Sequence, residues 1–126
     1  MTGATENRTT VFVYGTLMRE QSRHLALRDQ KFVSDAITEP IYRLLRVDDY
    51  PGLVDASDGE GNSIAGELWS VDQECLGRLD AIECVDAGLY ERRKILLTEP
   101  LTSADAWFYL QTIDGLPDLG TDWRSR

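Results

Sequence analysis

The sequence lacks any apolar run of the roughly 20 residues that a membrane-spanning helix needs. It also lacks the apolar core of a secretory signal near its start, because residues 1–8 are mainly small and polar. We therefore expect a cytoplasmic protein that begins with a flexible lead-in over residues 1–9. The chain has 126 residues, the length of one ordinary domain, which we expect to span residues 1–126.

Positive charge is scarce in this chain. It has 13 Lys and Arg residues against 22 Asp and Glu residues, which gives a formal net charge of −9 at pH 7. Such a surface repels phosphate backbones, and the basic run Arg92-Arg93-Lys94 is too short to offset that repulsion. We expect neither nucleic acid nor an anionic membrane as a partner, and a monomer is the default expectation.

The usual motifs for metal and cofactor chemistry are also missing. The sequence has no Cys-x-x-Cys, no His-Glu-x-x-His, no Walker loop and no dinucleotide fingerprint, so we expect no metal and no cofactor. Its cysteines, Cys75 and Cys84, fall at opposite ends of one expected helix, too far apart for a disulfide. The single histidine, His24, has no evident carboxylate partner, and no other histidine exists to activate Cys84 as a nucleophile.

Apolar periodicity predicts short strands and two helices. One helix is expected from about Leu17 to Leu27, with Thr16 as its cap, and a second is expected to end near Ile82, with Ser70 as the first residue of a capping box. The expected strands cover residues 10–14, 31–37, 41–47, 63–69, 89–97 and 104–110. Consecutive strands joined by short turns favour a mostly antiparallel, barrel-like sheet with helices packed on it, an α+β fold.

The first candidate site is the turn Tyr14-Gly15-Thr16-Leu17, between a buried strand and the first expected helix. Gly15 lets the backbone turn sharply and lets a ligand approach it closely. If a helix begins here, the amides of residues 15–17 lack helical acceptors and favour an anion or a developing oxyanion. The alternative is an ordinary strand-to-helix turn without a ligand.

The second candidate is Glu83, at the C-terminal end of the second expected helix. The negative end of the helix dipole, together with partial burial, would raise its pKa toward the range of a group that acts first as base and then as acid. Tyr90 and Arg92 lie on one face of the next strand, and the turn at residues 86–88 can fold that face over Glu83. The alternative is a solvated Glu83 and a core Tyr90.

Glu67 competes with Glu83 for the role of base, because it lies inside the expected strand Ser63–Trp69. An in-strand carboxylate of this kind is expected to face solvent on an amphipathic sheet. The tryptophans Trp69, Trp107 and Trp123 are expected to be core or tail anchors.

Several ordered segments together resemble the gamma-glutamylcyclotransferase family, near its gamma-glutamylamine cyclotransferase branch. The resemblance spans nearly the whole chain. The segments that carry it are Val11-Phe12-Val13-Tyr14-Gly15-Thr16-Leu17, Tyr50-Pro51-Gly52-Leu53-Val54, Gly66-Glu67-Leu68-Trp69, Leu79-Asp80-Ala81-Ile82-Glu83 with Tyr90-Glu91-Arg92, and Gly120-Thr121-Asp122-Trp123.

This resemblance implies a small mixed, mostly antiparallel β-barrel with flanking helices and a single pocket. It implies a cofactor-independent enzyme that converts a small gamma-glutamyl amine or amino acid to 5-oxoproline and a free amine. Glu83 would be the catalytic general base and acid, residues 14–17 would hold the gamma-glutamyl group, and Tyr90 would line the pocket.

The sequence departs from the family where Cys84 follows Glu83, since family members commonly have glycine there. Two alternatives stay open beside the enzyme. One is a non-catalytic module that binds a small metabolite in the same pocket, and the other is an enzyme that acts on a carrier-linked or peptide-linked glutamyl group.

Overall fold

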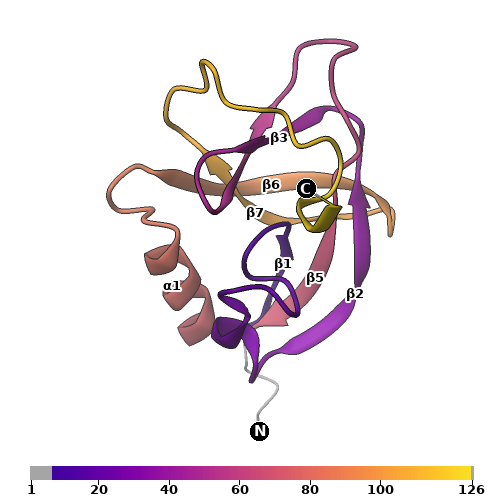
Figure 1. Cartoon of the computed structure of the whole chain (residues 1–126). Coiled ribbons are helices and arrows are strands. Elements are labelled where there is room, and N and C mark those ends of the chain that lie inside the picture. The colour runs from indigo at the N-terminus through magenta and orange to yellow at the C-terminus, as the bar shows by residue number, and fades with distance from the viewer. Residues whose placement is uncertain (1–6, 126) are drawn as a thin grey trace, which may run out of the picture.

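The strands of this protein form a closed barrel and a separate hairpin, seen in a computed structural model that describes residues 7–125 (Figure 1). The barrel order is β1-β5-β2-β6-β7. Its neighbours pair antiparallel except β1 and β7, which run parallel with Val11 opposite Asp105. The predicted α+β fold with a mixed, mostly antiparallel barrel is therefore confirmed. The strands are β1 (Thr9–Val13), β2 (Lys31–Thr38), β5 (Ala65–Val71), β6 (Tyr90–Glu99) and β7 (Ser103–Tyr109).

The hairpin consists of β3 (Tyr42–Arg46) and β4 (Pro51–Asp55), which lie over one end of the barrel (Figure 1). The C-terminal segment runs beside β3, where the Leu119 amide donates to Leu44 O at 2.8 Å. Trp123 opens a short 3-10 turn, η3 (Trp123–Ser125), and is fully buried. The hairpin and the C-terminal segment together close this end of the barrel.

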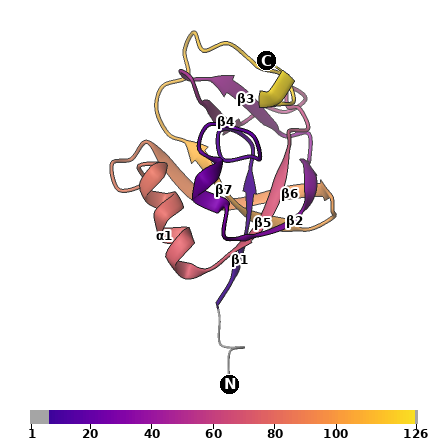
Figure 2. The same cartoon turned by 60° about the horizontal axis from the view of Figure 1, so that its bottom comes forward.

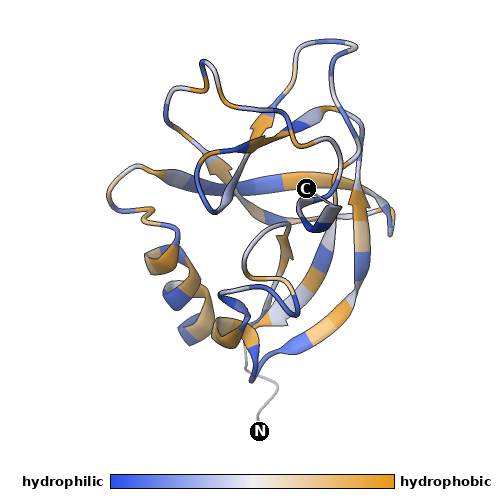
Figure 3. Cartoon of the chain, in the orientation of Figure 1, coloured by the Kyte–Doolittle hydropathy of each residue, from blue (hydrophilic) through white to orange (hydrophobic). Residues whose placement is uncertain are grey.

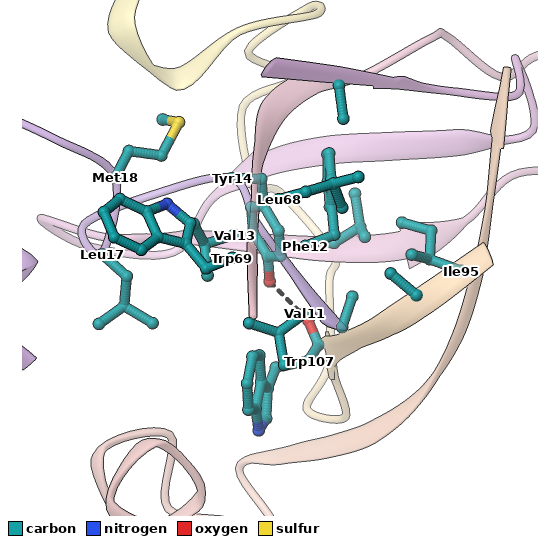
Figure 4. Close-up of a cluster of buried hydrophobic side chains, with 14 of the residues drawn as sticks. Val11, Phe12, Val13, Tyr14, Leu17, Met18, Leu68, Trp69, Ile95 and Trp107 are labelled. Atoms are coloured by element: carbon teal, nitrogen blue, oxygen red, sulfur yellow. Dashed lines mark hydrogen bonds between the residues drawn. The ribbon is translucent and has the colours of Figure 1, made fainter. Parts of the chain in front are cut away.

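The core fills the inside of the barrel with large side chains that alternate with polar residues along the strands (Figure 3). Trp69, Trp107 and Trp123 are all buried, as the sequence predicts for anchors. Figure 4 shows Trp107 below β1, with Val11, Phe12 and Leu68 in the same cluster.

The helix α1 (Gln73–Ile82) lies against the outside of the barrel, beside the short 3-10 helix η2 (His24–Leu27) (Figure 2). Its cap is Asp72, whose carboxylate accepts the Cys75 amide at 2.8 Å, so the prediction of Ser70 as the cap is wrong. Ser70 cannot be the cap because it still pairs in β5. The predicted helix end is confirmed, and Cys75 and Cys84 are free thiols.

The prediction of the first helix, over residues 17–27, is wrong except for the single turn of η2. Glu20 has a φ of 67°, which no right-handed helix accommodates. The Arg19 amide donates to the Glu67 carboxylate at 3.1 Å rather than to a helical carbonyl. The apolar spacing was also misleading, because Leu25 is 73% exposed.

The lead-in predicted over residues 1–9 lies mostly outside the described residues. Within the described part, Thr9 already pairs with Val71 in the barrel, and the Arg8 side chain donates to Ser70 O at 2.7 Å. Arg8 and Thr9 are therefore part of the structured chain, which corrects the prediction at these two positions. Among residues 7–125, no helix combines the length and apolar character that crossing a membrane requires.

Candidate active site

A pocket opens where the end of β1, the hairpin and the end of α1 meet. It brings together Glu83, Tyr90 and the turn 14–17, the site residues that the family resemblance implies. These residues come from chain segments far apart in the sequence. The remaining lining residues are Phe12, Val13, Tyr50, Pro51 and Trp107.

The turn 14–17 keeps its predicted place in the site although no helix follows it. It is a tight turn in which the Met18 amide donates to Gly15 O at 3.1 Å. Within the described residues, the amides of Gly15, Thr16 and Leu17 donate to no protein acceptor. A side chain at Gly15 would place its Cβ 2.6 Å from Pro51 Cγ, so glycine is required for the turn to pack against the hairpin. The result is a set of available backbone donors at the pocket wall.

Two tyrosines fix the floor of the pocket. The Tyr14 hydroxyl donates to Trp107 O at 2.6 Å (Figure 4), and the Tyr90 hydroxyl donates to Pro51 O at 2.6 Å. Burial raises the pKa of both phenols, and the neighbouring Glu83 carboxylate raises it further. Both phenols therefore stay neutral, and their hydrogen bonds tie β1 to β7 and β6 to the hairpin.

Glu83 is the carboxylate of the pocket, and it is the C-cap residue directly after α1. The helix ends in a Schellman motif, in which Cys84 donates to Ala81 O at 3.1 Å and Val85 donates to Asp80 O at 3.1 Å. Burial raises the Glu83 pKa from 4.5 to about 7, against the opposing effect of the Arg23 guanidinium. The carboxyl group is thus held near the balance point between base and acid at neutral pH.

Cys84 has a φ of 53°, in the left-handed region that the Schellman motif demands of this position. Glycine enters that region without strain, which gives a physical reason for the glycine that the family resemblance leads one to expect after the glutamate. Cysteine adopts the same geometry here, so the turn that presents Glu83 is kept.

The expectation that Glu67 faces solvent is wrong. Its side chain is 1% exposed, and it accepts hydrogen bonds from Arg19 Nε at 2.9 Å and from Trp69 Nε1 at 3.1 Å. Glu67 does not line the pocket that contains Glu83. The buried Glu67 carboxylate instead binds Arg19, in the segment that follows the turn 14–17.

Arg92 does not line the pocket and so is not placed to bind a ligand there. Its guanidinium pairs with Asp80 of α1 at 2.9 Å and with Asp105 of β7 at 2.9 Å. Asp80 also accepts a hydrogen bond from Trp107 Nε1 at 2.9 Å. The segment Leu79–Arg92 therefore contains the pocket carboxylate, Glu83. It also contains the Asp80–Arg92 ion pair, which holds α1 on the barrel.

Sequence reasoning missed the contributions of Tyr50, Pro51 and Trp107 to the pocket. Tyr50 and Pro51 belong to one of the segments that carry the family resemblance, and that resemblance could have indicated a place in the pocket. No sequence signal places Trp107 in the pocket, because its position depends on the barrel closing between β1 and β7. Within residues 7–125, no group of three or more His, Cys, Asp or Glu side chains is placed to hold a metal ion.

Comparisons with known proteins agree with this geometry. Residues 11–125 match the family described as Gamma-glutamyl cyclotransferase, AIG2-like. A putative gamma-glutamylcyclotransferase of Vibrio cholerae is 35% identical over 92% of this chain and 96% of its own length. Gamma-glutamylaminecyclotransferase A of Danio rerio is 37% identical over 69% of this chain and 57% of its own length. The crystal structure of an AIG2-like protein from Mus musculus superposes with a TM-score of 0.78 at 24% identity, covering 89% of this chain and 86% of the mouse chain.

A closed barrel with a single carboxylate in a donor-lined pocket, together with these relatives, defines an enzyme of the cyclotransferase class. The chain belongs to the Gamma-glutamyl cyclotransferase, AIG2-like, family.

Proposed function

We propose that this enzyme converts a gamma-glutamyl amine or gamma-glutamyl amino acid to 5-oxoproline and the free amine, with Glu83 as general base and then general acid. One observation carries the proposal: Glu83, with a pKa of about 7, shares a pocket with the unpaired amides of residues 15–17. The names of the relatives from Vibrio cholerae and Danio rerio support the same reaction.

The reaction needs few groups because the nucleophile belongs to the substrate. The Glu83 carboxylate takes a proton from the α-ammonium group, and the freed nitrogen attacks the γ-carbonyl carbon to close a five-membered ring. An intramolecular attack of this kind has the large effective molarity of two reactants held in one molecule. The carbonyl oxygen becomes an oxyanion, which the amides of residues 15–17 stabilise by hydrogen bonding.

Collapse of the oxyanion breaks the bond to the leaving nitrogen. The lactam nitrogen keeps one of the three protons of the α-ammonium group, and the leaving amine gains the other two, so no proton is consumed or released. Glu83 carries these protons between the two nitrogen atoms. A carboxyl group whose pKa lies near the working pH suits both directions of transfer.

The test is release of 5-oxoproline from gamma-glutamyl-alanine, gamma-glutamyl-ethylamine and ε-(gamma-glutamyl)-lysine. Wild type is expected to release it from at least one of these substrates, and Glu83→Gln is expected to lower kcat by about 10²–10⁴. Glu74→Gln is the matched control, because the same substitution falls on an exposed residue in the first turn of α1.

Turnover by Glu83→Gln at the rate of the Glu74→Gln control would rule out Glu83 as the base. Binding of these compounds without 5-oxoproline release by wild type would instead identify a non-catalytic binding module. Circular dichroism of each variant separates loss of chemistry from loss of fold.

A further inference from the structure

Arg23 is exposed and lies next to the pocket, although the sequence gives it no special signal. Its amide donates to Thr16 O at 2.8 Å, which fastens it to the turn 14–17. Its guanidinium carbon lies 5.8 Å from the centroid of the Tyr50 ring, which lines the pocket. Arg23 is therefore held against two of the segments that build the pocket wall.

The Arg23 guanidinium has no carboxylate partner among the described residues. Within residues 7–125 it makes no ion pair and no side-chain hydrogen bond, and its contact with an aromatic ring is the one with Tyr50. Six other arginines of this part of the chain pair with carboxylates. The ion pairs are Arg19–Glu67, Arg43–Asp118, Arg78–Asp29, Arg92–Asp80, Arg93–Asp55 and Arg124–Asp122.

The positive charge of Arg23 acts on the pocket itself. It lowers the pKa of Glu83 against the larger raising effect of burial, and it opposes the raised pKa values of Tyr50 and Tyr90 in the same way. The pocket thus has one carboxylate and one guanidinium nearby. A gamma-glutamyl compound has the complementary pair of charges, an α-ammonium group and an α-carboxylate.

We propose that Arg23 binds a carboxylate of the substrate next to the pocket and makes that carboxylate a requirement for tight binding. This inference rests on the proposed function. The carboxylate has two sources: the α-carboxylate of the gamma-glutamyl group, or the carboxylate of a leaving amino acid. A guanidinium binds a carboxylate by planar, charge-assisted hydrogen bonds, which an ammonium or an amide side chain cannot reproduce.

The test compares wild type, Arg23→Gln and Arg28→Gln on two substrates that differ only in a carboxylate, gamma-glutamyl-alanine and gamma-glutamyl-ethylamine. Arg28 is the matched control: it is exposed on the same segment, but it lies beside Leu25, Asp29 and Arg78 rather than at the pocket. Both variants remove one positive charge. We expect Arg23→Gln to raise KM by about tenfold or more with little change in kcat, and we expect the kinetics of Arg28→Gln to match those of wild type.

A higher KM for both substrates would assign Arg23 to the α-carboxylate, and a higher KM for gamma-glutamyl-alanine alone would assign it to the leaving amino acid. KM values equal to those of Arg28→Gln on both substrates would overturn the inference while leaving the proposed function intact. If wild type turns over neither of these substrates nor ε-(gamma-glutamyl)-lysine, the proposed function fails. The inference is then judged by calorimetric titration of gamma-glutamyl-alanine, where equal affinity for wild type and Arg23→Gln would overturn it.

Discussion

At the scale of single residues, Glu83 is placed where its charge is unfavourable for folding. Burial raises its pKa from 4.5 to about 7, so the folded protein holds this proton more tightly than the unfolded chain does. The Glu83 contribution to stability is therefore lost as the pH rises between these two values. This loss of stability is the cost that the proposed role of Glu83 as general base would bring with it.

Glu83→Gln is accordingly expected to be more stable than wild type at pH 8, by roughly 1–2 kcal/mol after allowance for partial exposure. The difference is expected to vanish below pH 4, where both side chains are neutral. Urea unfolding from pH 4 to pH 8 measures it, with the exposed Glu74→Gln as a control that stays level. A stability difference that does not grow with pH would contradict the burial of Glu83.

Cys84, the residue after Glu83, has a backbone conformation that lowers the stability of the protein. Its φ of 53° is strained for a side chain with a Cβ, and glycine removes that strain. Cys84→Gly is expected to stabilise the protein by about 0.5–1 kcal/mol, because the relief outweighs the added entropy of the unfolded chain. Chemical denaturation checks this. Cys84→Ala, which keeps the Cβ, should show no such gain, and an equal gain in both variants would point to the thiol instead.

At the scale of elements, α1 is aligned on the barrel by one carboxylate. Asp80 accepts Arg92 Nε at 2.9 Å and Arg92 Nη2 at 3.2 Å from β6, and Trp107 Nε1 at 2.9 Å from β7. Glu83 follows less than one turn later on the same helix. The position of the pocket carboxylate therefore depends on the Asp80 contacts.

Asp80→Asn is expected to lower the free energy of unfolding by about 1–3 kcal/mol, because it removes one of the two carboxylates that pair with the partly buried Arg92. We expect kcat to fall about tenfold as α1 loses its alignment, while the pH dependence of the remaining activity is unchanged. Asp29→Asn is the control, because it breaks the exposed Arg78 pair and should have a much smaller effect on stability. Equal effects of the two substitutions would show that Asp80 does not position the helix.

Some secondary-structure elements could be predicted from the sequence and others could not. The strands and α1 were predictable because their apolar periodicity matches the face that they bury, as Cys75, Leu76 and Leu79 do. The segment after Leu17 was not predictable, because the long-range Arg19–Glu67 hydrogen bonds decide its path. Its helical propensity is overridden by a partner 48 positions away.

At the scale of the whole molecule, the pocket exists because barrel closure brings distant segments together. Glu83, Tyr90 and the turn 14–17 could be singled out from the sequence through local patterns and the family resemblance. The same patterns could not place Arg23 next to the pocket or Trp107 on its wall, because these positions follow from packing between elements. The site is therefore a property of the closed barrel and its hairpin.

Glu67 links three parts of that closed structure. Its carboxylate lies in β5, binds the Arg19 side chain and amide beyond the turn 14–17, and lies 3.8 Å from Arg124 Nη1 near the C-terminus. Burial raises its pKa, but the hydrogen bonds from Arg19 and Trp69 outweigh burial and the net pKa is lowered. This carboxylate therefore stabilises the fold above the unfolded pKa of 4.5, and the stabilisation is lost as the pH falls through the folded value.

Glu67→Gln is expected to lower the free energy of unfolding by about 2–3 kcal/mol at pH 7, since it leaves the Arg19 charge without its buried partner. The loss should shrink as the pH falls below 4.5, because wild type then loses the same charge. Urea unfolding at pH 7 and at pH 3 measures both values, and Asp35→Asn serves as the control because Asp35 is the exposed partner of Arg19. A cost at pH 7 no larger than that of Asp35→Asn would mean that the barrel, the turn and the C-terminus are held together without Glu67.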